Sequence, residues 1–357
     1  MSQRVLMTGG LGYLGSVAAP YLERAGYDVT ILDTGFFKNS LLFDAAPART
    51  IFKDARDISD ADLHGIDAVV HLAGISNDPF GSLREEKIYD PTREYARRLA
   101  FFCKKRGARF IFASSCSVYG KGGSGLSDED SLPDPQTAYS RNKIQIEEDL
   151  SSLADGSFSP IALRFATAFG LSPRMRFDIV INMFAGMAIA EGKIVLNSNG
   201  EGWRPNVHVE DISRAVLSAL RVHYNEGRLL ILNVGTEENN MKIIDIAACV
   251  SDACANVPIS FLQNGAVHEG KELIQSKLIG EGGADTRTYQ VSFRKIKKFF
   301  PDFSCRYSVQ DGVRAMAVQF RELGLDAAAF RNPKFYRLQT IEALLKSGRI
   351  GDDLRWI

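Results

Sequence analysis

The feature that most constrains the fold is a glycine-rich turn between a short apolar run and a helical pattern. The apolar run is Arg4–Thr8, Gly9, Gly12 and Gly15 follow it, and helical spacing covers Gly15–Ala25. The first glycine allows a tight turn, the second lets the backbone approach a pyrophosphate, and the third lets the helix pack on the strand. The helix N-terminus adds free N–H groups and a partial positive charge. The sequence therefore predicts a dinucleotide-binding strand–turn–helix unit at its start.

Further short apolar runs alternate with helical patterns and end in small or polar residues. They cover Asp28–Leu32, Ala68–Leu72, Arg109–Ala113 and Ile161–Phe165. Continuous apolar strands joined by helical crossovers indicate a parallel sheet that is covered on both faces. We therefore expect an α/β fold: a doubly wound, Rossmann-like parallel sheet with a smaller mixed C-terminal substrate lobe. In such sheets ligands bind at the carboxyl ends of the strands.

The pattern becomes less regular after Ser151, and this sets the expected domains. Strand patterns return near Val207–Val209 and Leu229–Val234, and a helical pattern covers Phe177–Glu191. We expect three parts: an NAD-binding domain of residues 1–165 and 206–235, a nucleotide-sugar-binding lobe of residues 166–205 and 236–320, and a C-terminal helical extension of residues 321–357. The extension could cap the core or mediate dimerisation.

The composition excludes several function classes. Among 357 residues, Lys+Arg and Asp+Glu both number 43, so the net charge is about zero. This balance argues against a chain-wide basic surface for nucleic acid or a membrane. We expect no spanning helix, because no apolar run reaches 18 residues. The N-terminal apolar run is too short for a secretory signal, so we expect a cytoplasmic protein. Five cysteines without a CxxC pair, and no HExxH motif, give no support for disulfides or a metal site.

Acidic and small residues at the strand ends predict how a dinucleotide is held. Asp33 follows Gly15 by 18 residues, near the distance at which a carboxylate meets the adenosine ribose, and it selects NAD over NADP. Asp54 could bind the adenine amino group or simply cap a turn, and His71 is expected to be a packed strand histidine. The predicted NAD-binding residues are Gly9, Gly12, Tyr13, Leu14, Gly15, Asp33, Asp54, Ala55, Leu72, Ala73, Gly74, Ser114, Tyr139 and Lys143.

A tyrosine and a lysine four residues apart predict the catalytic chemistry. On a helix, Tyr139 and Lys143 share a face. A free phenol has a pKa of about 10, and a nearby ammonium lowers it, so the pair can act as a base at neutral pH. Ser115, at an earlier strand end, can donate a hydrogen bond to a substrate oxygen that becomes a carbonyl. We predict that these three residues are catalytic.

Taken together, the motifs TGGLGYLG, HLAG, SSCSVYG, YSRNK and RPNVHVED, with Asp33, resemble the extended short-chain dehydrogenase/reductase family, nucleotide-sugar epimerase/dehydratase type. The resemblance covers about residues 4–300 and implies NAD as cofactor, a nucleotide-diphosphate sugar as substrate and a homodimer. It also implies that Arg204 contacts the substrate diphosphate, which suits a guanidinium fork. Arg176 is a further phosphate or sugar candidate. The predicted substrate-binding residues are Ser115, Cys116, Ser117, Thr167, Arg174, Asn182, Arg204 and Arg287.

Departures from the family pattern reduce the number of reactions that we expect this chain to catalyse. Dehydratases of the family carry Asp-Glu where this chain has Cys116 and Ser117, which argues against 4,6-dehydration. Cys116 could carry a proton or be a buried structural thiol. Thr167 and Phe169 replace the family's Asn and Tyr on the nicotinamide side. We expect an NDP-sugar epimerase that works through a 4-keto intermediate. The alternatives are a 4-dehydrogenase or 4-ketoreductase with exchangeable NAD(H), an NAD-sensing binding protein, and a dehydrogenase of small alcohols.

Overall fold

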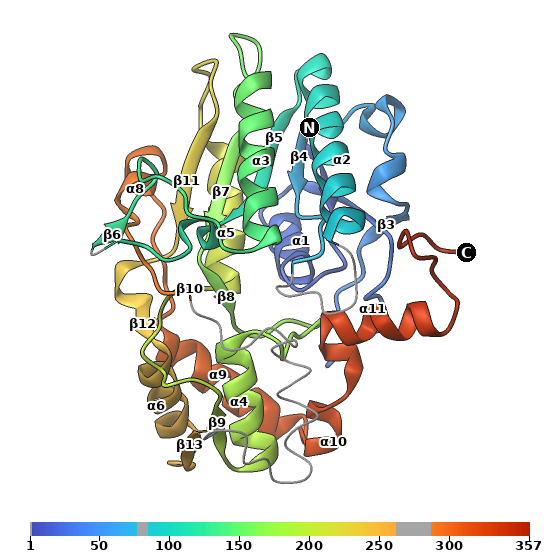
Figure 1. The fold of residues 1–357 in the computed structure, drawn as a ribbon. Helices are drawn as coiled ribbons and strands as arrows, with labels where there is room; N and C mark the ends of the chain where they lie inside the picture. Colours follow the sequence, from blue (N-terminus) through green and yellow to red (C-terminus); the bar gives the residue numbers. More distant parts are fainter. Residues whose placement is uncertain (1, 77–84, 124, 262–286) are drawn as a thin grey trace.

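The computed structural model describes residues 2–76, 85–123, 125–261 and 287–357 (Figure 1). Its main element is a seven-stranded parallel sheet in the order β11-β7-β5-β4-β1-β2-β3. This sheet and its flanking helices confirm the predicted α/β, doubly wound fold. The strands are β1 (Arg4–Thr8), β2 (Asp28–Asp33), β3 (Arg49–Phe52), β4 (Ala68–His71), β5 (Arg109–Ser115), β7 (Ile161–Phe165) and β11 (Leu230–Val234).

The strand order reverses between β1 and β4, and this switch point creates the ligand crevice. β2 and β3 extend the sheet on one side of β1, whereas β4, β5, β7 and β11 extend it on the other. The turn after β1 lies against the end of β4: a Cβ on Gly9 would come within 2.6 Å of the Ala73 backbone nitrogen. Gly9 also has φ +74°, so only glycine fits this position without strain.

Helices cover both faces of the sheet. α1 (Gly15–Arg24) packs on α5 (Val209–Arg221), and α2 (Glu85–Arg106) packs on α3 (Ala138–Leu153) on the opposite face (Figure 1). Alternate side chains of β1 enter different cores: Val5 and Met7 pack with α1 and α5, and Leu6 packs with α2 and α3. The strand period of two therefore explains how one short apolar run fills both cores.

A smaller mixed lobe lies beyond the carboxyl ends of the strands (Figure 1). Its small sheets have the orders β12-β10-β8 and β13-β9, and β14 pairs with β6 near the edge. The elements are β6 (Leu126–Ser127), β8 (Thr167–Phe169), α4 (Val180–Glu191), β9 (Ile194–Leu196), β10 (Trp203–His208), β12 (Asn240–Lys242), α6 (Ile243–Ala253), β13 (Ile259–Phe261), β14 (Gln290–Val291), α8 (Arg294–Phe299) and α9 (Val309–Glu322).

Two expected element boundaries are wrong. Helix α4 begins at Val180 rather than Phe177, because the Phe177 ring packs edge-on against three aromatic rings of the C-terminal region: Phe320, Phe330 and Phe335. The strand expected at Val207–Val209 ends at His208, whose ring accepts a hydrogen bond from the Glu210 N–H and caps α5.

The C-terminal segment returns toward the main sheet. α10 (Ala327–Phe330) and α11 (Arg337–Lys346) follow α9, and Ile341 of α11 packs in one cluster with Ile88 of α2. The end of the chain lies near β3 (Figure 1). Short 3-10 turns are η1 (Ala55–Asp57), η2 (Asp60–Leu63), η3 (Cys116–Tyr119), η4 (Glu237–Asn239) and η5 (Pro333–Phe335). In the portion of the chain that the structure describes, no helix is both long and apolar enough to cross a membrane.

Candidate active site

A cleft of about 740 Å³ lies at the carboxyl ends of the sheet strands and extends to the lobe. Every predicted NAD-binding residue lines it, from the glycine turn and Asp33 to Ser114 and Lys143. Five of the predicted substrate-binding residues also line it: Ser115, Ser117, Thr167, Arg204 and Arg287. The structure thus brings together predicted residues that are as much as 278 positions apart in the sequence, Gly9 and Arg287.

The glycine turn and Asp33 line one end of the cleft. The Asp33 carboxylate accepts hydrogen bonds from the Leu11 N–H at 3.0 Å and the Gly35 N–H at 2.7 Å. Burial raises the pKa of Asp33, and these two bonds oppose the rise. Gly12 lines the cleft, and a Cβ added to it would meet only the Gly9 carbonyl oxygen, at 3.2 Å. These residues fit a dinucleotide, since the backbone is bare where a pyrophosphate approaches and a fixed carboxylate stands where a ribose is expected.

Asp54 lines the cleft, but its carboxylate is already engaged. It accepts a hydrogen bond from the Arg56 backbone N–H at 2.8 Å and caps η1. It also accepts from the Arg56 guanidinium at 2.6 to 3.0 Å. These contacts match the alternative in which Asp54 caps a turn rather than binding the adenine amino group. Arg56 in turn donates to the backbone carbonyls of Asp353 and Leu354, so the C-terminal segment also borders the cleft.

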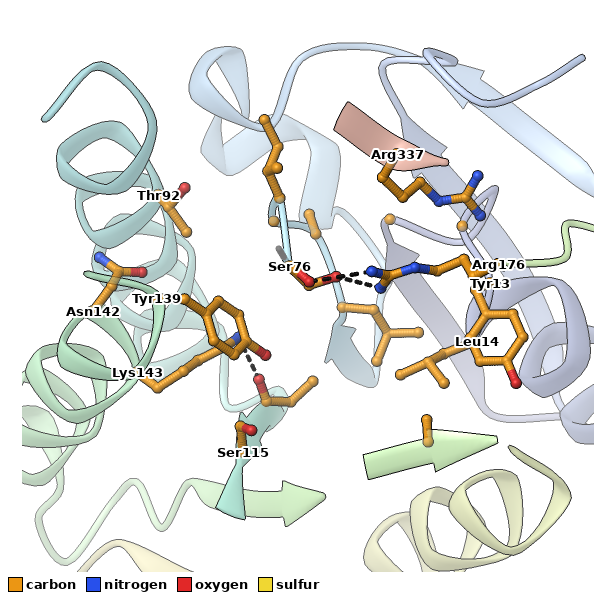
Figure 2. Close-up of a pocket in the computed structure, with 18 of the residues that line it drawn as sticks. Tyr13, Leu14, Ser76, Thr92, Ser115, Tyr139, Asn142, Lys143, Arg176 and Arg337 are labelled. Atoms are coloured by element: carbon orange, nitrogen blue, oxygen red, sulfur yellow. Dashed lines mark hydrogen bonds between the residues drawn. The ribbon is translucent and has the colours of Figure 1, made fainter. Parts of the chain in front are cut away.

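The predicted catalytic residues face one part of the cleft (Figure 2). Tyr139 and Lys143 lie on α3, where the Thr137 side chain caps the first turn. The Lys143 Nζ lies 5.4 Å from the Tyr139 ring centroid and donates to the Ala113 carbonyl at 2.6 Å. Burial lowers the pKa of Lys143 to about 8, and the Glu147 carboxylate opposes this. The Ser115 Oγ donates to the Ser117 Oγ at 2.9 Å. A phenol beside a cation, with a hydroxyl nearby, can exchange a proton with a bound alcohol.

A buried ion pair beneath these residues was not predicted from the sequence. Glu147 lies on α3 and Arg164 on β7, and each side chain is only 4% exposed. The Arg164 Nη2 donates to Glu147 at 2.6 Å and its Nη1 donates to the Tyr119 hydroxyl at 2.9 Å. The Ser114 hydroxyl also donates to Glu147. The pair therefore joins α3 to the ends of β5 and β7. Its only sequence signal is that Glu147 follows Lys143 by four residues on one helix face.

Three predicted substrate-binding residues do not line the cleft, where a substrate contact was expected: Cys116, Arg174 and Asn182. The Cys116 thiol is buried and donates to the Arg164 carbonyl at 3.1 Å, and burial raises its pKa. These contacts correspond to the structural-thiol alternative. The Asn182 amide donates to the Tyr13 hydroxyl at 3.1 Å. The Arg174 Nη1 donates to the Ser16 Oγ at 3.0 Å. Both thus fix the lobe to the glycine turn.

Other lining residues come from loops and from the C-terminal segment. Arg176 donates to the Ser76 Oγ at 2.9 Å, so a lobe residue meets the loop after β4 (Figure 2). Arg176 also donates to the Asp178 carboxylate at 2.9 Å. Arg337, Asp353 and Leu354 have no motif around them in the sequence. Only the folded path of the chain reveals them as lining residues.

The fold and the lining define an NAD-dependent enzyme of the extended short-chain dehydrogenase/reductase type. Residues 5–235 match the sequence model of the NAD dependent epimerase/dehydratase family, and the chain belongs to this family.

Known proteins of related sequence and structure are nucleotide-sugar enzymes. The chain is 27% identical over 266 residues to a UDP-glucose 4-epimerase of Neisseria meningitidis serogroup C, a match that covers 66% of this chain and 78% of the relative. It is 28% identical over 272 residues to the UDP-glucose 4-epimerase of Bacillus subtilis, covering 65% and 77%. The structure of MoeE5 in complex with UDP-glucuronic acid and NAD has TM-score 0.70 and 25% identity, covering 89% of this chain and 99% of MoeE5.

Proposed function

We propose that the protein is an NAD-dependent epimerase that inverts C4 of a UDP-sugar through a 4-keto intermediate. The observation that carries the proposal is the placement of Tyr139 and Lys143 on one face of α3, beside Ser115, in the cleft that the glycine turn also lines. The UDP-glucose 4-epimerases among the relatives support both the reaction and the nucleotide.

The three catalytic residues divide the proton chemistry between them. The glycine turn and Asp33 would hold NAD, which would supply an acceptor and donor of hydride for C4 of the sugar. Tyr139, as a phenolate, takes the proton of the C4 hydroxyl and later gives it back. Lys143 holds a positive charge beside the phenol and thus favours the phenolate. The Ser115 hydroxyl turns from Ser117 and donates to the substrate oxygen while that oxygen becomes a carbonyl.

Two arginines that line the cleft where it reaches the lobe are proposed to hold the nucleotide diphosphate. Arg204 is 6% exposed and lines the cleft with Arg287. Its Nη1 donates to the Trp203 carbonyl at 2.8 Å and to the Arg287 carbonyl, which fixes the direction of the guanidinium. A fixed planar fork suits a diphosphate, because two parallel N–H groups can meet two phosphate oxygens.

Incubation with UDP-sugars tests the proposal. UDP-glucose, UDP-N-acetylglucosamine and UDP-glucuronic acid are each supplied without added coenzyme, and the products are separated by chromatography. We expect at least one C4 epimer and no net NADH. Net NADH formation on added NAD would instead favour a dehydrogenase, and no turnover of any UDP-sugar would contradict the substrate class. From the family resemblance we also propose a homodimer in the cytoplasm, and light scattering of the purified protein tests the dimer.

A further inference from the structure

One buried arginine of the cleft wall comes from outside the family-matched region. Arg337 opens α11, is 3% exposed and lines the cleft. Its Cζ lies 4.3 Å from the Phe37 ring centroid, and its Nη2 donates to the Arg174 carbonyl at 3.0 Å. Its Nη1 is buried and has no hydrogen-bond partner among the described residues. A buried N–H without an acceptor is costly, so this atom needs an explanation.

The charges around this arginine leave a positive excess. Two other guanidinium groups, those of Arg174 and Arg176, and two carboxylates, those of Asp33 and Asp178, act on it. Both carboxylates already accept other bonds, Asp33 from backbone N–H groups and Asp178 from Arg176. Burial first, and the Arg176 guanidinium second, lower the pKa of Arg337 to about 9, although the Asp178 carboxylate opposes this. Three cations thus face two anions, and an anion in the cleft would balance them.

The position of this arginine indicates which anion. Arg337 lies on the side of the cleft that carries Tyr13 and Leu14, across from Tyr139 and Lys143 (Figure 2). Tyr13 and Leu14 belong to the turn at the N-terminus of α1, where the backbone favours a pyrophosphate. We propose that Arg337 binds the pyrophosphate of NAD and so supplies, from the C-terminal segment, a phosphate ligand that the family-matched region does not contain. This inference rests on the NAD assignment of the proposed function.

Calorimetric titration of NAD-free protein tests the inference with three ligands: NAD, ADP and adenosine. Arg337→Met keeps a long side chain on Phe37 and removes the charge. We expect the Kd of NAD and of ADP to rise about 10- to 100-fold, as for the loss of a charge-assisted bond, and the Kd of adenosine to stay unchanged. The melting temperature of the ligand-free variant should not fall, because one buried cation has been removed from a cluster with excess positive charge. Arg331→Met is the control, since Arg331 pairs with Glu191 away from the cleft lining.

Several results would overturn the inference. Unchanged ADP binding in Arg337→Met, with a lower melting temperature, would mean that Arg337 only supports the fold. An equal rise in the Kd of adenosine would place the guanidinium at the nucleoside instead. If Arg337→Met does not fold, Arg337→Lys decides, because the retained charge should preserve the preference for ADP over adenosine, and its loss would refute the inference. Wild-type protein that binds neither NAD nor ADP would refute the cofactor assignment itself.

Discussion

The buried ion pair beneath the proposed catalytic residues allows a quantitative prediction. Glu147→Gln keeps the size of the side chain but removes the charge that faces Arg164. Both side chains are 4% exposed, and Glu147 accepts bonds from the Arg164 Nε at 3.0 Å, from its Nη2 at 2.6 Å and from Ser114. Removing one partner of a buried pair leaves the other charge uncompensated, which typically costs about 3–5 kcal/mol. We expect the free energy of unfolding to fall by this amount.

Urea unfolding of the NAD-free protein measures this loss. Glu148→Gln is the matched control, because Glu148 is the exposed neighbour on the same helix and should change the free energy of unfolding by no more than about 0.5 kcal/mol. The double change Glu147→Met with Arg164→Met should recover much of the loss, since well-packed apolar residues often replace a buried pair at little cost. A loss below about 1 kcal/mol in Glu147→Gln would refute the reasoning.

Three further predictions concern the catalytic residues and the chain end. Tyr139→Phe should lower turnover at least about 100-fold, as measured by product analysis, and change the Kd of NAD far less, as measured by calorimetry; undiminished turnover would remove the proton-transfer role. Burial lowers the pKa of Lys143 to about 8, so its ammonium loses a proton as the pH rises through 8. Turnover measured from pH 6 to 10 should therefore fall above pH 8, and a flat pH profile would contradict this. Removal of residues 352–357 deletes the carbonyl acceptors of Arg56, including that of Leu354. Bound NAD should then be lost faster during dialysis. An unchanged rate of loss would show that residues 352–357 do not cover the cofactor.

Local spacing explains which parts of the site were predictable. The glycine turn lies directly between a strand and a helix, and Tyr139 and Lys143 are fixed relative to each other by one turn of helix. Such short-range geometry can be read from the residues alone. The direction of a side chain at a strand end is harder to predict from the sequence. Successive residues of a strand point to opposite faces of the sheet, so an error of one position in the predicted strand reverses the expected direction. Ser115 lines the cleft, whereas its neighbour Cys116 is buried behind it.

The unpredicted residues depend on the long-range path of the chain. Arg337 meets the glycine-turn side of the cleft only because α9, α10 and α11 bring the segment back to the main sheet (Figure 1). Arg164 lies on β7, and its partner Glu147 comes from a different element, α3. No local sequence pattern predicts the position of Arg337 in the cleft or the contact between Arg164 and Glu147. The division into the domains expected from the sequence likewise stays a prediction, although β11 joins the main sheet and β10 pairs with β8 and β12.

In the proposed reaction, a single carbon of the sugar gives up a hydrogen and receives the same one back on its other face. UDP-glucose with deuterium at C4 measures this directly by mass spectrometry and proton NMR of the products. We expect a C4 epimer that keeps the deuterium at C4, with no free NADH in solution. Loss of the label to water, or deuterated NADH released into solution, would contradict it.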